Sequence, residues 1–466
     1  MPVVKQVAIA IQDTPNVAAS PDGDSVLDIL TAEFSRSREL RDSSASTGTL
    51  SPTAKPVGRR SSELTVELAV RGSGDAATAP RLAPAILAAN FRAVDVLSMA
   101  LSVALDEQLE VGDLITGNTS TATALVAATA KIGATTVLIV PLAGTWSTAE
   151  QVNSATRGSN VGTTHGTAVI GEEPAGVAYK PITFAEVTCD ATGSFSGGTP
   201  SAGDSVKFRV GATVIGEAEF VSHASDVLTV RMFWGTISAG CVCETTAGET
   251  ITVDTPAGVA AAVGPQLTAR YLRGNRVETI ENARTTIEVS ADAGADAVLK
   301  FTLTGKPGTT VDGVKITPTN LETTTPPRFG RHSTTNVGGA NVAGLRMPVR
   351  SVQVSVGNTV VQVPDANSVD GEKGGEITGR ASTVNLTIEQ TGIAALNVQA
   401  LADAGTTVPV GVEIGTDSGN RFAIIARSAQ IAEIADGEDE GIATYQITVN
   451  PVTPGDGDDE LLFVFS

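Results

Sequence analysis

The sequence is poor in aromatic residues, in cysteine and in positive charge. Aromatic residues make up 4% of the 466 positions, whereas valine, alanine, threonine and glycine abound. A core with few large rings must be built from small and β-branched side chains, which favour sheets. The length is sufficient for roughly two or three domains with large cores. The composition therefore predicts a mainly β protein.

The few cysteines exclude a disulfide-stabilised scaffold. Cys189, Cys241 and Cys243 are odd in number and widely spaced, so they form neither a disulfide framework nor a C-x-x-C zinc pattern. The opening residues have no signal-peptide layout, and Lys131 interrupts the apolar run around Leu125 well short of a membrane span. We therefore expect a soluble protein in a reducing cytoplasm, without a membrane segment.

Positive charge is scarce relative to negative charge. The chain has 31 Lys and Arg residues against 51 Asp and Glu residues, a formal charge of -20. An acidic surface repels phosphates, which argues against a protein that grips the nucleic-acid backbone. The same balance suits a wall past which DNA slides without binding, and it also has the simpler explanation of solubility.

The sequence also lacks the motifs of catalysis and ligand binding. His165, His223 and His332 stand in unrelated contexts, with no H-E-x-x-H motif and no G-x-S-x-G elbow. The Gly72-Ser73-Gly74 break lacks the third glycine and the Lys-Ser/Thr of a phosphate loop. The acidic residues from Asp456 to Glu460 do not have the spacing of an EF-hand. We expect no enzyme, no cofactor and no metal site.

The clearest structural signal lies between Ser62 and Phe91. Apolar residues alternate with polar ones from Glu63 to Arg71, the period of a strand with one face in a core. Gly72-Ser73-Gly74-Asp75 ends this strand. A short helix is expected after Pro80, with Leu82, Ile86, Ala89 and Ala93 on one side at helical spacing.

The residues before this strand predict two further strands and a long loop. The strands are expected at Val3 to Ile11 and Val26 to Phe34, separated by a Pro/Asp/Gly turn. The segment from Ser35 to Ser61 has no apolar period and is rich in serine, threonine and proline, so a loop is predicted. It is basic in a strongly acidic protein. The alternatives are a solvated loop and a contact arm that reaches an acidic neighbour.

The middle of the chain, from Asp106 to Asp254, predicts a repeat. A shift of 91 residues places Gly203-Asp204 on Gly112-Asp113 and Gly235-Thr236 on Gly144-Thr145. Each copy is expected to be a small β module of hairpins, and the pair is expected to be an insertion carried outside the main domain.

The remaining residues predict short strands around one helix. The helix is expected near Gly392 to Ala404. The strands are expected at residues 267–271, 285–289, 298–304, 384–388, 408–414, 422–426 and 445–449. Another alternating run contains Val352, Val354 and Val356. Residues 317–330 are predicted to be a linker. The second half is therefore predicted to be a β-sandwich or barrel with a flanking helix.

These motifs together resemble the tail tube (major tail) proteins of long-tailed bacteriophages. The resemblance rests on the strand, Gly-x-Gly break and short helix of the first part, and on Phe301-Thr302-Leu303-Thr304-Gly305. It continues in Asp365-Ala366-Asn367-Ser368-Val369-Asp370-Gly371, in Ile377-Thr378-Gly379-Arg380, and in Gly457 to Leu461 entering a last strand. It covers roughly residues 1–105 and 256–466 and leaves the middle unmatched.

The resemblance implies a fold, a domain order and an assembly. It implies a tail-tube-type β-sandwich or barrel with two short flanking helices plus inserted β modules. The expected parts are residues 1–105 (first part of the core), 106–255 (insertion), 256–325 (return of the first half) and 326–466 (second half). Subunits of such proteins form rings, usually hexameric, whose inner sheets join into a barrel. The rings stack around a tape-measure protein, with tail terminator and distal tail proteins as further partners.

The expected function is therefore structural. The bore conducts DNA from capsid to host without specific binding, and the expected location is the virion tail, with the host cytoplasm during assembly. Three alternative functions remain: the inner tube of a contractile tail, a β-rich surface display or binding module, and a phage-associated hydrolase. The missing export signal argues against display, and the missing catalytic residues argue against the hydrolase.

Charge patterning suggests where rings contact one another. The predicted loop carries the basic candidates Arg36, Arg38, Arg41, Lys55, Arg59 and Arg60. The C-terminal region carries the acidic candidates Glu433, Asp436, Glu438, Asp439, Glu440, Asp456, Asp458, Asp459 and Glu460. We predict that the basic arm of one ring docks on an acidic region of the next. Exposed pairs contribute only about 0–1 kcal/mol each, so sheet completion and apolar packing must supply most of the assembly energy.

Overall fold

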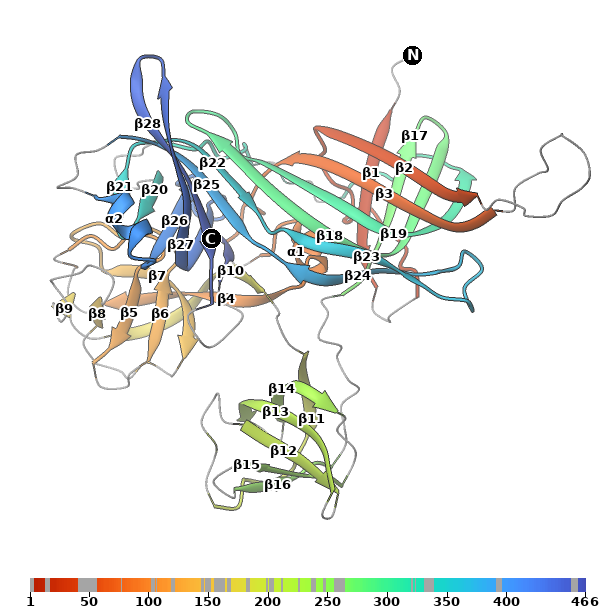
Figure 1. Ribbon diagram of the computed structural model, residues 1–466, viewed down its shortest axis with the longest axis horizontal. Coiled ribbons are helices and arrows are strands. Elements are labelled where there is room, and N and C mark those ends of the chain that lie inside the picture. The colour runs from red at the N-terminus through yellow and green to blue at the C-terminus, as the bar shows by residue number, and fades with distance from the viewer. Residues whose placement is uncertain are drawn as a thin grey trace, which may run out of the picture. The chain divides into compact units, whose positions relative to one another are not determined.

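The computed structural model is mainly β, with one large antiparallel sheet and smaller accessory sheets (Figure 1). It describes residues 4–12, 17–40, 57–76, 78–101, 105, 107–118, 122–143, 146, 152–154, 164–165, 169–181, 185–197, 200, 205–210, 213–224, 227–235, 240–245, 249–254, 265–319, 322, 324–330, 339–390, 396–453 and 460–466. The chain divides into two compact units. Unit 1 is Met1–Pro181, Pro265–Pro454 and Asp459–Ser466, and unit 2 is Ile182–Gly264 and Gly455–Asp458.

The first half of unit 1 combines segments from both sides of the middle region. Its elements are β1 (Lys5–Ile11), β2 (Thr31–Leu40), β3 (Val57–Ala69), α1 (Ala83–Ala88), β17 (Leu267–Arg273), β18 (Arg276–Asp292) and β19 (Val298–Asp312). The strands pair antiparallel in the order β1, β17, β18, β19, β3, β2. Pro84 lies in the first turn of α1, where a missing N–H costs nothing. The helix buries Ala85 and Ile86 in the core.

The second half has the same plan. Its elements are β20 (Gly339–Val342), β21 (Leu345–Met347), β22 (Val349–Ser355), β23 (Asn358–Pro364), β24 (Glu372–Arg380), β25 (Thr383–Glu389), α2 (Val398–Asp403), β26 (Thr407–Ile414), β27 (Phe422–Asp439) and β28 (Ile442–Pro451). The strands pair in the order β20, β26, β27, β28, β25, β22. Each strand of the first half thus has a counterpart in the second, and α2 follows β25 as α1 follows β3.

The two halves share strand register as well as strand order. Two matches come from the β2–β3 and β23–β24 hairpins: Arg38↔Arg60 matches Asn358↔Arg380, and Leu40↔Val57 matches Val360↔Ile377. Two more come from the β17–β18 and β26–β27 pairs: Leu267↔Ala283 matches Val408↔Ala429, and Ala269↔Ile280 matches Val410↔Ala426. In the first two matches every residue is displaced by 320, and the one-residue irregularity of the hairpin recurs at the same place. The last two matches reproduce the same β-bulge on β18 and β27. The core of unit 1 formed by these strands is therefore an internal duplication.

The halves join edge to edge through β18 and β22. One edge of β18 pairs with β19 from Arg276 to Ser290. On the other edge, residues 276–283 pair with β17 and residues 288–292 pair with residues 351–355 of β22. This joint makes one eight-stranded sheet in the order β2, β3, β19, β18, β22, β25, β28, β27. Its two outermost strands, β2 and β27, lie at opposite ends in Figure 1.

The eight-stranded sheet has one apolar face and one polar face, because side chains alternate along each strand. On the apolar face Leu64, Phe301, Val354 and Leu386 are buried in the main core cluster. The same cluster contains Ile86 of α1 and Val398 of α2. Both helices therefore cover the apolar side, and the polar face stays accessible.

A close contact between glycines also ties the halves together. Gly72 N–H donates to the side chain of Asn420 (3.0 Å), and Gly74 N–H donates to the carbonyl of Gly419 (3.0 Å). A Cβ added at Gly72 would overlap the Gly419 carbonyl oxygen and lie 2.8 Å from Asn420 Cα. Gly419 has φ of 78°, a conformation that side chains rarely adopt. The break after β3 therefore packs backbone against backbone.

Two small modules with the same strand order occur in the middle of the chain. In unit 1, β4 (Phe91–Leu101), β5 (Leu114–Gly117), β6 (Thr123–Val126), β7 (Thr136–Ala143), β8 (Val152–Ser154) and β9 (Thr164–His165) pair in the order β4, β7, β6, β5, β8, β9. In unit 2, β11 (Ala185–Asp190), β12 (Ser205–Val210), β13 (Thr213–Ala224), β14 (Val227–Gly235), β15 (Val242–Thr245) and β16 (Thr250–Thr252) pair in the order β11, β14, β13, β12, β15, β16. β5 and β12, and β7 and β14, begin 91 residues apart, the shift seen in the sequence. The predicted domain boundaries themselves stay a prediction.

The first module is continuous with the duplicated core of unit 1. β10 (Val169–Pro181) pairs with β4 on one side and with β29 (Leu462–Phe465) on the other. β29 in turn pairs with residues 422–425 of β27. Unit 2 has a separate core that includes Phe208, Val230 and Cys243.

Several sequence predictions need correction. No sheet closes into a barrel in the described part of the chain, because β2 and β27 remain apart as edges. Both described ends of the predicted loop at residues 35–61 are strand: β2 extends to Leu40 and β3 begins at Val57, and residues 41–56 lie outside the described residues. Both faces of these strand ends are polar, so the strands carry no apolar period. The predicted second strand begins at Thr31 rather than Val26.

The predicted helices are shorter than expected. α1 ends at Ala88, and Ala93 belongs to β4. Asn90 has φ of 68°, which stops the helix and turns the chain into a strand. α2 begins at Val398, where the Asn397 side chain accepts a hydrogen bond from Ala400 N–H (3.0 Å). The earlier part of that predicted helix, residues 392–395, lies outside the described residues.

Candidate assembly surface

The polar face of the eight-stranded sheet is a ladder of hydroxyl, amide and charged groups. Cross-strand hydrogen bonds join Thr65 to Thr302 (3.3 Å), Ser351 to Thr387 (3.0 Å) and Thr448 to Asn385 (2.8 Å). Lys300 Nζ lies 3.2 Å from Glu288 Oε2. A shallow hollow above the β18–β22 joint is lined by Ser290, Gln353, Asn385 and Thr448 among others. This face is hydrophilic and presents few groups that could bind a polyanion.

The two ends of the sheet are open strand edges in the described part of the chain. β2 pairs with β3 on one side only. β27 pairs with β26 and β29 near its start, but residues 433–439 pair with β28 alone. An open edge leaves backbone N–H and C=O groups available to another strand. These edges are sites for sheet extension.

The basic candidates of the β2–β3 hairpin mostly bind acidic groups of their own chain. Arg36 Nη2 lies 3.4 Å from Glu278 Oε2, and its Nη1 donates to Thr310 (3.0 Å). Arg59 lies 3.3 Å from Glu39, and Arg60 lies 3.6 Å from Asp370. These pairs leave less charge for a partner than the sequence suggested.

The other basic candidates differ in position. Arg38 is exposed on β2, and within the described residues it forms no ion pair. Arg41 and Lys55 lie outside the described residues.

The acidic candidates Glu433, Asp436, Glu438, Asp439 and Glu440 lie on the β27–β28 hairpin and are exposed. Glu440 (φ 53°) and Gly441 (φ 80°) form its two-residue turn, in which both residues have positive φ. The hairpin projects from the second half in Figure 1.

Two acidic candidates are bound to arginines. Asp439 pairs with Arg350, and Glu460 lies 3.0 Å from Arg380 Nη1. Asp456, Asp458 and Asp459 lie outside the described residues. Among the candidates that the structure describes, no basic one contacts an acidic one.

Sequence reasoning missed a basic hollow beside β2. The hollow is lined by Lys5, Ala32, Glu33, Phe34, Arg36, Arg38, Tyr271, Arg273, Arg276 and Glu278. Strands β1, β2, β17 and β18 contribute these residues, so no short sequence window contains them. It also missed the duplication of unit 1. The displacement of 320 was detectable, since Ser35, Arg60 and Ser62 recur as Ser355, Arg380 and Ser382.

The ionisable groups buried in unit 1 form structural pairs. Glu413 is 2% exposed, and Arg421 Nε lies 3.5 Å from its Oε1. Burial raises the pKa of Glu413 to about 7, against the opposing effect of Arg421. Thr129 N–H also donates to this carboxylate (3.3 Å). Both members of the pair are buried, Glu413 on β26 and Arg421 just before β27.

Of the three histidines, His223 is the one whose side-chain contacts the structure describes. In unit 2 the His223 ring contacts the Ala191 carbonyl (2.9 Å). His165 is in β9, and His332 lies outside the described residues. No cluster of His, Cys, Asp and Glu with metal-binding geometry occurs among the residues described. Neither α1 nor α2, the helices of the described chain, is long or apolar enough to cross a membrane.

Comparison with known proteins is negative. No protein-family model and no curated protein matches the chain. The arrangement of edges, faces and charges is therefore the basis on which its function is argued.

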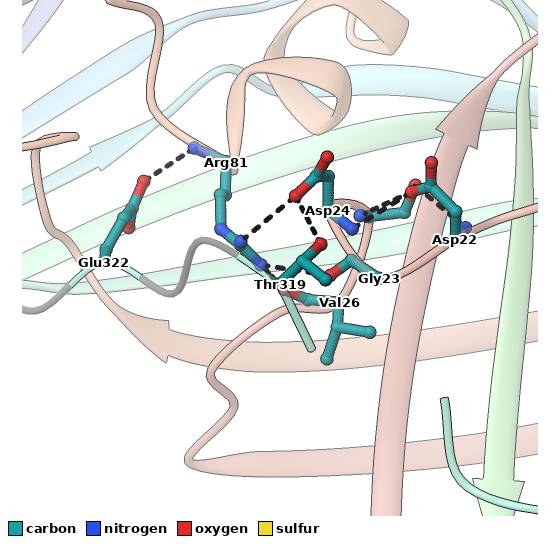
Figure 2. Close-up of polar contacts among 8 residues, drawn as sticks. Asp22, Gly23, Asp24, Val26, Arg81, Thr319 and Glu322 are labelled. Carbon is teal, nitrogen blue, oxygen red and sulfur yellow. Dashed lines mark hydrogen bonds and ion pairs between the residues drawn. The ribbon is translucent and has the colours of Figure 1, made fainter. Parts of the chain in front are cut away.

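A polar cluster fixes the connection between the halves to the start of α1 (Figure 2). Arg81 Nη1 donates to the Val26 carbonyl (2.9 Å), and its backbone N–H donates to Glu322 (2.8 Å). Asp24 accepts from Thr319 (2.6 Å) and lies 3.8 Å from Arg81 Nη2. The turn after β1, the helix and the connecting segment are thus held together beneath the sheet.

Proposed function

We propose that this chain is the structural subunit of a phage tail tube. Copies assemble into rings, and stacked rings form a tube whose bore conducts DNA from capsid to host. The observation that carries the proposal is the eight-stranded sheet with one buried face, one polar face and two open edges. Such a sheet is complete only when other strands cover its edges.

The polar face suits the wall of a DNA channel. Glu288 neutralises Lys300, and Glu67 lies opposite Lys300 on β3. Hydroxyl and amide side chains such as Thr302 and Asn385 lie elsewhere on the same face. DNA phosphates bind where basic groups release counterions. A neutral to acidic wall lets DNA pass without that attraction, so the polynucleotide is cargo rather than a specific ligand.

The duplication changes the expected number of chains in a ring. Rings of the proteins that the sequence resembles are usually hexameric. Since each chain carries two half-sheets, three chains supply the six half-sheets of such a ring. The proposed partners are the tape-measure, tail terminator and distal tail proteins. The proposed location is the virion tail, and the proposal includes no membrane.

Stacking along the tube is a separate contact. The hairpins β2–β3 and β23–β24 are counterparts, so each half offers one hairpin to a neighbouring ring. Reversing Arg59 and Arg60 to Glu is expected to impair tube growth while rings still form, because these hairpin residues do not line the basic hollow beside β2. Tubes of unchanged length would exclude this hairpin from the stacking contact.

Electron microscopy of the purified chain tests the proposal. Rings or tubes of constant bore are expected, and native mass measurement then counts the chains per ring. Dispersed monomers at high concentration would instead favour a display or binding module, for which unit 2, a separate compact β unit, is the supporting observation. An inner tube of a contractile tail would form the same rings and also bind a sheath protein.

A further inference from the structure

We propose that residues 433–439 of β27 pair antiparallel with β2 of a second copy, in the register that β18 and β22 use within one chain. This inference rests on the proposed function and specifies which edges meet and which residues face one another. The contact is heterologous, since two different edges meet, so repeated contacts make a ring or an open chain.

The internal joint is the template for this contact. β27 is the counterpart of β18, and β2 is the counterpart of β22. Inside the chain the second part of β18 is covered by β22. At the ends of the sheet, the second part of β27 and the outer edge of β2 pair with no further strand in the described chain. Lys5 Nζ donates to the Ala32 carbonyl of β2 (3.0 Å), so this side chain must move or share that carbonyl when a second copy pairs here. β18 and β22 therefore pair within the chain, whereas their counterparts β27 and β2 do not pair with each other in the described chain.

The matching residues of β18 and β27 follow from their pairing with β19 and β28. Thr285↔Leu303 corresponds to Ile431↔Val449, a displacement of 146. β27 then has one additional bulged residue, Ala432, so Thr286↔Thr302 corresponds to Glu433↔Thr448. After the bulge, residues of β27 are therefore displaced from those of β18 by 147 instead of 146. β2 is displaced from β22 by 320 throughout. The pairs expected between copies are Ala435↔Ser35, Asp436↔Phe34, Gly437↔Glu33, Glu438↔Ala32 and Asp439↔Thr31.

The orientation of the side chains provides an independent check. Ala435 lies opposite Gln446 and Ser35 lies opposite Glu63, and all four are on the polar face. The expected Ala435↔Ser35 pair therefore continues this face from one copy to the next. A slip of one residue would turn the polar side of one sheet toward the core side of the other.

The other face of the joint is complementary in charge. Within the chain, Val289 and Ala291 on β18 are buried at the joint. Their counterparts on β27 are Asp436 and Glu438, which are exposed. In the expected register these carboxylates lie opposite Phe34 and Ala32, beside the basic hollow.

The difference between the joints has a consequence for assembly. Carboxylates on an exposed edge keep a free chain soluble and hinder pairing with a wrong strand. The basic hollow neutralises them at the correct edge. The contact between copies is therefore expected to weaken with salt, whereas the internal joint is not.

Cysteine cross-linking tests the register. Chains carrying Ser35→Cys are mixed with chains carrying Ala435→Cys under assembly conditions and mildly oxidised. Disulfide dimers that contain one chain of each kind are expected, since the Cα atoms of directly opposed residues in an antiparallel pair lie within the range that a disulfide spans. The native cysteines are buried and do not compete.

Two matched variants control the experiment. Glu433→Cys, on the same face two residues away, is expected to cross-link Ser35→Cys chains several-fold less. Glu288→Cys with Ser355→Cys in one chain reproduces the internal pair and is expected to form an intrachain disulfide without producing dimers.

Charge reversal tests the occupant of the basic hollow. Asp436→Lys with Glu438→Lys is expected to abolish ring formation, and adding Arg36→Glu with Arg38→Glu to the same chain is expected to restore it, because every joint of the ring is then complementary again. If wild-type rings form but Ser35→Cys and Ala435→Cys chains do not cross-link above the Glu433→Cys control, this joint is wrong and the tube proposal stands. If wild-type chains form no rings, both are wrong.

Discussion

Replacing Gly72 by alanine tests whether the backbone contact between the halves is required for unit 1. The new Cβ would overlap the Gly419 carbonyl oxygen and lie 2.8 Å from Asn420 Cα. Both neighbours are backbone atoms, so no side-chain rotation can relieve the overlap. Overpacking of this kind costs about 1–3 kcal/mol, and a weakened Gly72 N–H to Asn420 hydrogen bond adds about 1 kcal/mol. We expect the free energy of unfolding to fall by about 2–4 kcal/mol.

Urea denaturation of the unassembled chain measures this change. Gly379→Ala is the matched control: Gly379 lies in β24, and the nearest atom to an added Cβ is Thr359 Oγ1 at 3.9 Å. This control is expected to change stability by less than about 0.5 kcal/mol. Equal midpoints for the two variants at unchanged denaturant slope would refute the contact between Gly72 and Gly419.

Three further predictions concern buried and clustered groups. The folded-state pKa of Glu413, about 7, lies above its ordinary 4.5, so the folded chain retains a proton in this window. Stability should therefore fall from pH 4.5 to 7 by up to about 1.4 kcal/mol per pH unit, and Glu413→Gln should remove that slope in urea titrations at several pH values. Burial raises the pKa of the Cys243 thiol to about 12, so a thiol reagent at pH 8 should label it only after unfolding; rapid labelling of the native chain would contradict its burial. Arg81→Ala removes the hydrogen bond to the Val26 carbonyl and should lower stability by about 1–3 kcal/mol, whereas the exposed Arg328→Ala should have little effect in the same assay.

Local patterns in the sequence predicted much of the strand content. The alternation from Glu63 to Arg71 predicted β3, and the runs at residues 408–414 and 445–449 predicted β26 and β28. These strands have one buried face, so their period is visible in the residue order. The strand pairing of residues 35–40 with residues 57–61 was missed because these described residues have no continuous buried face.

Charge patterning located groups but not their partners. The sequence placed Arg36, Arg59 and Arg60 in one basic segment, and the fold supplied Glu278, Glu39 and Asp370 as their intrachain partners. Glu278 lies more than two hundred residues away in sequence from Arg36. Ion pairs across strands depend on which strands are neighbours, and residue order does not contain that information.

The sequence by itself determined that the chain is mainly β, that its middle repeats with a shift of 91, and that acidic and basic groups are segregated. Only the tertiary structure revealed that unit 1 is built twice on one plan, because the insertion separates β3 from its neighbour β19. Which edges remain open was likewise decided by the fold. Strand pairing is a long-range property, and an edge is defined by the neighbour that the folded chain does not provide.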